Sequence, residues 1–402
     1  MLRWCTPGYV AWIVASTVSA LGGGVLTFAL VWTATGISGT LAGTLSAVSL
    51  VPTTALLLIG GALGDSLGQR RLLQITTVVQ VLQGIALWIL LHTSIPLVAV
   101  LIGNAIVAGA LQGLGSPSSV VYARQFVPVD DVKAAMAVAS AVGSITRMAG
   151  PSLGALALAA VGLSGSVLVN AVSFAGVLFV LFAITPATTP AKSVGRTSLR
   201  GHVVEGAASV WRHRTARVML LSTGLVAGSL LPVVGLGIPL LVRSHQWPTT
   251  VAGLLEGCWL AGSLVVSLIV SARYARQPHA RASGLVSGPL LAALGVVAIT
   301  GAPNPAFASV ACVVMGMGTS LFTANVAPVL TATAPPELQS RWSAITALSQ
   351  FLPLIVVNPV LGIAADHLGT PVTLLGLAVP AAAAGVLQAH HRFPDSVEQD
   401  PS

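Results

Sequence analysis

The chain has 402 residues, of which 55% are hydrophobic and only 7% are charged, and its mean hydropathy is +0.91. A soluble domain carries roughly 25% charged residues, so this composition excludes a soluble enzyme and places most of the chain in lipid. The formal net charge of +8 does not indicate nucleic-acid binding, because most basic residues lie in short segments between apolar runs. These runs are long and unbroken, which predicts membrane-spanning helices of about 20 residues rather than short alternating β-strands.

Apolar runs cut by charges and by Pro/Gly breaks predict twelve membrane-spanning helices. Six lie in the first half, at residues 9–34, 40–63, 72–92, 96–121, 134–159 and 164–185. Six more follow a polar stretch, at residues 217–241, 249–271, 283–300, 305–331, 341–365 and 370–389. The expected fold is an all-α integral membrane protein with a six-helix half at 1–185, a cytoplasmic linker at 186–216, a second half at 217–389 and a cytoplasmic tail at 390–402.

The positions of the basic residues predict the orientation of the chain in the membrane. An even number of helices leaves both termini on one side. If that side is the cytoplasm, it receives 16 of the 18 Lys and Arg, while Arg243 falls outside and Arg147 lies within a helix. Because cytoplasmic loops are enriched in Lys and Arg, we expect a multi-pass protein of the plasma membrane with both termini in the cytoplasm.

A short pattern occurs at the same place in each half. Pro128 precedes two aspartates and is followed by Lys133, whereas Pro336 precedes Glu337 and is followed by Arg341. Both patterns open the fifth helix of their half, where an acidic residue is stabilised by the helix N-terminus. Their equivalent placement indicates a duplicated six-helix unit.

The segment between the second and third helices carries the clearest motif. Residues 61–71 read Gly-Ala-Leu-Gly-Asp-Ser-Leu-Gly-Gln-Arg-Arg between two apolar runs. Carboxylates and guanidiniums are costly in hydrocarbon, so this segment must lie at a membrane face, and its arginines mark that face as cytoplasmic.

Twelve helices, a central linker and this segment together resemble the major facilitator superfamily. The family motif is Gly-x-Leu-Ala-Asp-Arg-x-Gly-Arg-Lys/Arg, and it is matched by Gly61, Leu63, Asp65, Gly68 and Arg70. Ser66 and Gln69 replace two of its usual basic residues. The resemblance implies transport by alternating access, with a gating role for Gly61, Asp65, Gly68, Arg70 and Arg71. In that role Asp65 accepts hydrogen bonds from the N-terminus of the eleventh helix, while the alternative is a local cap.

The fifth helix resembles the Gly-Pro motif of exporter branches of the same family. The motif is carried by Gly150, Pro151 and Gly154, which closely follow Arg147. Its spacing removes a helix hydrogen bond and permits close packing, which predicts a kink at the interface between the halves. A plain packing kink is the alternative.

One feature of exporter members is absent. They often carry an arginine three residues before the Gln-Gly of the fourth helix, and that family arginine is implicated in proton coupling. Here Gln112 and Gly113 are present, but the arginine position is Gly109. A standard proton-antiport circuit is therefore not encoded at this position.

Arg147 and Glu256 are the charges expected inside helices. Arg147 lies about 13 residues from the inner start of the fifth helix and Glu256 about seven from the outer start of the eighth. At 1.5 Å per residue these positions are roughly 20 Å from the inner face and roughly 10 Å from the outer face, so in a core of about 30 Å their depths coincide. The resemblance places these helices side by side across the two halves. We therefore expect an ion pair in one transport state, with Glu256 as a carrier of the coupling proton. A static pair, or a carboxylate facing water, is the alternative.

The remaining expectations concern the solute. The resemblance implies that helices one, four, seven and ten line a central cavity, with the candidate residues Trp12, Asn104, Gln112, Thr223, Met315, Phe322 and Asn325. Such a weakly charged wall suits an amphipathic or largely apolar small molecule. Packing between helices is the alternative role for each of these residues.

No catalytic, metal-ligating, cofactor or ATP-binding pattern is found in the sequence. The sequence thus favours a non-enzymatic exporter, driven by protons and acting on a small molecule across the lipid bilayer, and the family resemblance implies a monomer. An importer, a uniporter or a non-transporting membrane receptor of the same fold are the alternatives.

Overall fold

The structure is a computed structural model of the chain, and it describes residues 6–128, 131–185, 209–274, 282–333 and 339–390. Within these ranges the chain is helical with short connections and contains no strand. It divides into two compact units, one made of residues 1–37 and 44–195, the other of residues 38–43 and 196–402. The start of the second helix thus belongs to a different unit from the rest of that helix.

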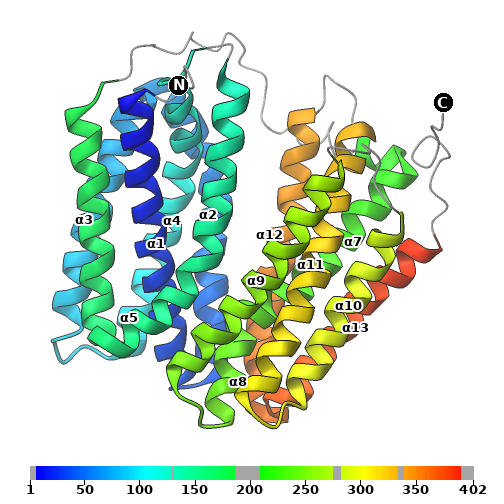
Figure 1. The fold of residues 1–402 in the computed structure, drawn as a ribbon. Coiled ribbons are helices and arrows are strands. Elements are labelled where there is room, and N and C mark those ends of the chain that lie inside the picture. Colours follow the sequence, from blue (N-terminus) through cyan, green and yellow to red (C-terminus); the bar gives the residue numbers. More distant parts are fainter. Residues whose placement is uncertain (1–5, 129–130, 186–208, 275–281, 334–338, 391–402) are drawn as a thin grey trace. The chain divides into compact units, whose positions relative to one another are not determined.

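The first unit is a bundle of long helices drawn from blue to green in Figure 1. They are α1 (Pro7–Thr35), α2 (Gly39–Leu67) from residue 44 onward, α3 (Gln69–Leu90), α4 (Leu97–Arg124) and α5 (Val132–Ala183). α5 has 52 residues but is interrupted at Gly162, where φ is +68°, so it supplies two membrane-spanning segments. α1 packs along α5, and α3 packs on both α4 and α5.

The second unit is drawn from green to red in Figure 1. Its elements are α7 (Arg214–Pro232), the π-helical turn η2 (Val233–Gly237), α8 (Ile238–Ser244), α9 (Thr249–Tyr274), α10 (Ala282–Thr300), α11 (Pro305–Thr333), α12 (Gln339–Leu368) and α13 (Thr370–Ala389). α7, η2 and α8 continue one another as a single apolar segment, residues 214–244. α11 packs against both α9 and α10, and α13 contacts α7, α10 and α12.

The predicted all-α membrane fold is confirmed. Eleven helices of the described chain are long and apolar enough to cross a membrane, and the interrupted α5 spans two of the predicted segments. Large apolar side chains are widely exposed on these helices; Val172, Phe179 and Leu268 keep 70%, 72% and 69% of their surface accessible. Exposed hydrocarbon on this scale is expected where the surrounding solvent is lipid rather than water.

The connection between α2 and α3 is shorter than the predicted segment 61–71. α2 continues to Leu67 and α3 begins at Gln69, so Gly68 alone separates them. Gly68 has φ +89°, a left-handed conformation in which side chains are strained, and this lets the chain reverse direction in one residue. Gly369, with φ +85°, separates α12 from α13 in the same way.

Parts of the predicted linker and repeat lie outside the described residues. The described chain resumes at residue 209, and residues 214–216, which the sequence assigns to the linker, form the first turn of α7. Residues 129–130 and 334–338, which carry much of the repeated Pro/acid pattern, also fall outside the described ranges.

Replacing Gly369 with alanine tests the one-residue turn. A Cβ at Gly369 meets no atom within 4 Å, so the expected cost is conformational, about 1–2 kcal/mol for a left-handed residue. We expect Gly369→Ala to lower the melting temperature of the detergent-purified protein. Gly376→Ala is the matched control, because Gly376 lies within α13, has no positive φ and is equally unobstructed. Equal melting temperatures for the two variants would contradict this explanation.

Candidate functional site

Glu256 is a buried carboxylate in the second unit. It lies in the second turn of α9, and only 2% of its surface is accessible. Its Oε2 atom is enclosed and has no hydrogen-bond partner among the described residues. An ionisable side chain in such a position is rare in membrane helices and usually marks a functional site.

A second unsatisfied polar atom lies one turn further along α9. The indole Nε1 of Trp259 is buried and makes no hydrogen bond within the described chain. Residues three apart on a helix lie on the same face, so a free acceptor and a free donor are neighbours here. We call Glu256 and Trp259 the α9 polar pair.

The α9 polar pair is held on closely packed helices. The hydroxyl of Ser263 on α9 donates to the carbonyl oxygen of Gly316 on α11 at 3.0 Å. A Cβ added at Gly316 would collide with the carbonyl of Trp259, and one at Gly262 would collide with that of Val313. α9 and α11 are therefore in backbone contact beside the pair, at positions where only glycine fits.

Arg147 lies in the first unit. Its side chain is exposed, and its Nη2 donates to the hydroxyl of Ser144, one turn earlier on α5, at 3.3 Å. The predicted ion pair with Glu256 would join residues of different units, and it stays a prediction.

The predicted cavity residues of the first unit differ in environment. Trp12 is 3% exposed and packs edge-on against Tyr122, with ring centroids 4.7 Å apart. Asn104 is buried, and its Oδ1 accepts from Nε2 of Gln83 at 2.9 Å. Gln112 is exposed. Trp12 and Asn104 thus have partners inside their own unit, whereas Gln112 is accessible.

The predicted cavity residues of the second unit are all buried. Thr223 on α7 donates to the carbonyl oxygen of Met219 at 2.7 Å. Met315, Phe322 and Asn325 lie on α11, and Asn325 donates to the carbonyl oxygen of Leu321 at 2.7 Å. Thr223 and Asn325 thus bond to carbonyl oxygens of their own helices. Contact of these residues with a solute stays a prediction.

The Gly-Pro motif of α5 packs against α1. A Cβ at Gly150 would lie 2.9 Å from Cα of Gly24, and one at Gly154 would lie 2.7 Å from Cβ of Phe28. Pro151 lies between these contacts within the helix. The motif therefore supports backbone contact between α1 and α5 inside the first unit.

The motif around Asp65 combines an exposed acid with a structural arginine. Asp65 is exposed and accepts from Nε2 of Gln69 at 3.1 Å. Arg70 reaches the end of α5, where its Nε and Nη2 donate to the carbonyl oxygens of Leu181 and Phe182 at 2.9 and 3.2 Å. Helix C-termini leave their last carbonyls unpaired and carry partial negative charge, so this guanidinium is a cap.

The other predicted members of the same motif make fewer contacts. Arg71 is exposed. A Cβ added at Gly61 would meet no atom within 4 Å, so Gly61 makes no close approach here. Gly64 makes one instead, because a Cβ there would collide with the side chains of Gln69 and Ser118.

Gly109 occupies the position where exporters often carry arginine, and the structure shows why arginine is not accommodated. A Cβ at Gly109 would collide with the carbonyl oxygen of Ser49 on α2 and lie 3.0 Å from Cγ of Pro52. The hydroxyl of Thr53 also donates to the carbonyl oxygen of Gly109 at 2.9 Å. α4 and α2 are therefore in backbone contact at this point.

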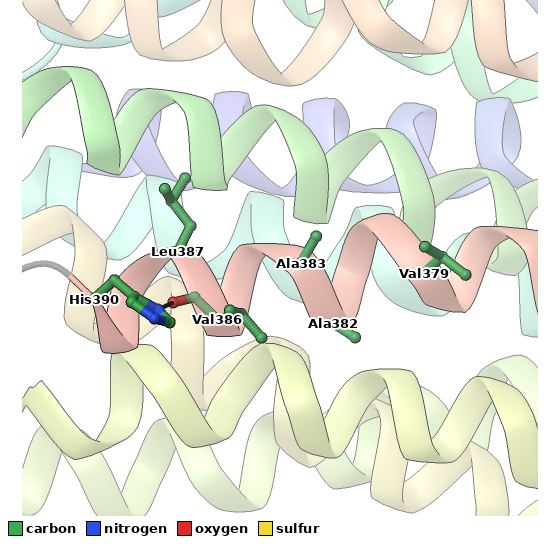
Figure 2. Close-up of a pocket in the computed structure, with 6 residues that line it drawn as sticks. All are labelled: Val379, Ala382, Ala383, Val386, Leu387 and His390. Carbon is green, nitrogen blue, oxygen red and sulfur yellow. Dashed lines mark hydrogen bonds between the residues drawn. The ribbon is translucent and has the colours of Figure 1, made fainter.

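A pocket on the second unit is unrelated to these residues. Figure 2 shows that its lining comes from α13 and the residue that follows it: Val379, Ala382, Ala383, Val386, Leu387 and His390. Nδ1 of His390 bonds to the carbonyl oxygen of Val386 at 2.9 Å. Val379 and Val386 are 67% and 50% exposed on this membrane helix, so we assign the pocket to lipid contact.

These features define a polytopic helical membrane protein with two units and a buried carboxylate. Residues 12–357 match the sequence profile of the Major Facilitator Superfamily. The chain therefore belongs to the major facilitator superfamily, a family of membrane transporters, and nothing in it indicates catalytic activity.

Individual relatives are distant but cover nearly the whole chain. The multidrug efflux pump Tap of Mycolicibacterium fortuitum is 23% identical over 397 residues, which is 93% of each chain. Among solved structures, the nucleoside transporter NupG is 11% identical with a TM-score of 0.73, covering 96% of this chain and 100% of that one. A bacterial homologue of the human lysosomal transporter Spinster is 13% identical, also with a TM-score of 0.73, over 96% and 95% of the two chains. These structures share the fold.

The arginine cap on α5 is testable by truncation. Removing Arg70 leaves the carbonyls of Leu181 and Phe182 without their charged donor, and hydrogen bonds to charged groups contribute roughly 1.5–3 kcal/mol. We expect Arg70→Ala to lower the melting temperature by several degrees. Arg71→Ala is the matched control, because Arg71 is an exposed neighbour, and an equal loss in both variants would contradict the cap.

The close contact at Gly109 predicts intolerance of any side chain. Overpacking of a tight contact costs roughly 1–3 kcal/mol per small addition. We expect Gly109→Ala to lower the melting temperature and Gly109→Arg to prevent accumulation of folded protein. Gly103→Ala, on the same helix with no atom near its Cβ position, should melt like the parent protein. A stable, folded Gly109→Arg protein would show that α2 and α4 are not held together there.

Proposed function

We propose that this protein is a secondary transporter that exports small amphipathic or largely apolar molecules in exchange for protons, working by alternating access. It acts as a monomer in the plasma membrane with both termini in the cytoplasm. The full-length similarity to a multidrug efflux pump supports export, and the buried Glu256 supports coupling to protons.

The coupling role rests on the environment of Glu256. Its Oε2 atom is buried with no partner among the described residues. A carboxylate without a counter-charge is costly to bury, so its protonation depends on whether water or a cation reaches it. Alternating access exposes and closes the interior in turn, and this carboxyl would bind a proton in one state and release it in the other.

The α9 polar pair also supports a class of solute. Glu256 offers an acceptor and Trp259 a donor and an aromatic face, within helices that are otherwise apolar. Lipophilic cations and neutral amphipathic molecules with one polar end suit this combination, because aromatic rings attract cations and apolar walls bind the rest of the solute.

An importer or uniporter is the second candidate. Gly109 has no room for the arginine that exporters often carry, and the fold is shared with a nucleoside transporter. The direction of solute transport therefore has to be measured together with its coupling to protons.

The decisive variant is Glu256→Gln, which keeps size and shape but cannot ionise. In liposomes containing purified protein, we expect proton-gradient-driven accumulation of a fluorescent lipophilic cation such as ethidium to be lost. Exchange of the same compound without a gradient should continue, because binding and alternation remain possible. Leu254→Ala is the control on the same helix, because Leu254 is 53% exposed on the apolar surface. Gradient-driven accumulation at the parent level in Glu256→Gln would contradict the coupling role.

A further inference from the structure

Asp366, in the last turn of α12, binds the N-terminus of α2. Its Oδ1 accepts from the backbone N–H of Gly39 at 2.7 Å. Its Oδ2 accepts from the backbone N–H and from the hydroxyl of Thr40, at 2.8 and 2.7 Å. These N–H groups are among the first four of α2, which have no partner within the helix, and the helix dipole favours a negative charge there.

Backbone contacts extend this binding along both helices. A Cβ at Gly39 would lie 2.8 Å from the carbonyl oxygen of Gly362 and 2.9 Å from Oδ1 of Asp366. A Cβ at Gly43 would collide with the carbonyl oxygen of Asn358. Gly39 and Gly43 are four residues apart, and so are Asn358, Gly362 and Asp366, so one face of α2 meets one face of α12.

Both partners of this contact belong to the second compact unit. Residues 38–43 belong to the second unit and residues from 44 onward to the first. Asp366 therefore binds the first residues of α2, whereas the rest of that helix belongs to the first unit.

The sequence around Asp366 repeats the motif around Asp65. Residues 61–68 read Gly-Ala-Leu-Gly-Asp-Ser-Leu-Gly and residues 362–369 read Gly-Ile-Ala-Ala-Asp-His-Leu-Gly. Both end in a glycine with positive φ that precedes the next helix, +89° at Gly68 and +85° at Gly369. The arginine distribution predicts that the first copy lies at the cytoplasmic end of α2 and the second at the outer end of α12.

We propose that Asp366 is the outer latch of the transporter: it clamps the N-terminus of α2 when the outer side is closed and releases it when that side opens. This inference rests on the proposed alternating-access transport.

The latch is tested by measuring the outer opening without any solute. Spin labels are attached at cysteines replacing Ser94, in the connection between α3 and α4, and Thr250, in the first turn of α9, both exposed and in different units. The three native cysteines are replaced beforehand. Distances are recorded by pulsed electron spin resonance in lipid nanodiscs.

We expect Asp366→Asn to raise the ratio of the longer to the shorter distance population by roughly tenfold, as loss of a charged hydrogen-bonded contact implies. Thr40→Val, which removes only the hydroxyl donor, should shift the ratio in the same direction by less. Asp65→Asn should not raise the longer-distance population at this end. An unchanged distribution in both Asp366→Asn and Thr40→Val would overturn the latch.

The distance measurement and the transport assay together show which of the two proposals fails, the latch or the export. A shifted distribution in a protein that moves none of the tested compounds would support the latch and contradict the proposed export. Normal proton-driven export with no shift in either variant would contradict the latch alone.

Discussion

Backbone contact between helices at small residues determines how this protein is built. Lipid gives helices no hydrophobic reason to associate, so close packing at small residues and interhelical hydrogen bonds must hold them together. α1 meets α5 at Gly24 and Gly150, α2 meets α4 at Gly109, and α9 meets α11 at Gly262 and Gly316. The last of these contacts lies beside the buried Glu256 and Trp259 on α9.

The same packing shapes the chemistry available for coupling. Contact at Gly109 leaves no room for the arginine common in exporters of this family, while Glu256 lies buried where α9 and α11 are in backbone contact. The proposed coupling therefore centres on the second unit rather than on the fourth helix of the first. Within the second unit, a further carboxylate, Asp366, accepts hydrogen bonds from the backbone N–H groups that open α2.

Helix number and placement were predictable because hydrocarbon thickness sets the length of each apolar run. The packing of Trp12 against Tyr122 was not predictable, because α1 is apolar on all sides and its sequence does not show which face meets Tyr122. Gly68 is evident as part of a motif, but not as the sole residue between two helices. The contact of Asp366 was missed although its sequence repeats that of Asp65 at four positions. The Arg147–Glu256 pair depends on how the two units meet, which sequence patterns do not fix.

The most direct test of this account is solute movement by the purified protein in liposomes under an imposed proton gradient. A labelled lipophilic cation is offered on the face that corresponds to the cytoplasm, and its concentration inside and outside is followed over time. The account predicts accumulation against the concentration gradient that collapses when a protonophore is added. Saturable binding of the compound without transmembrane movement would contradict transport and identify a receptor on the same fold.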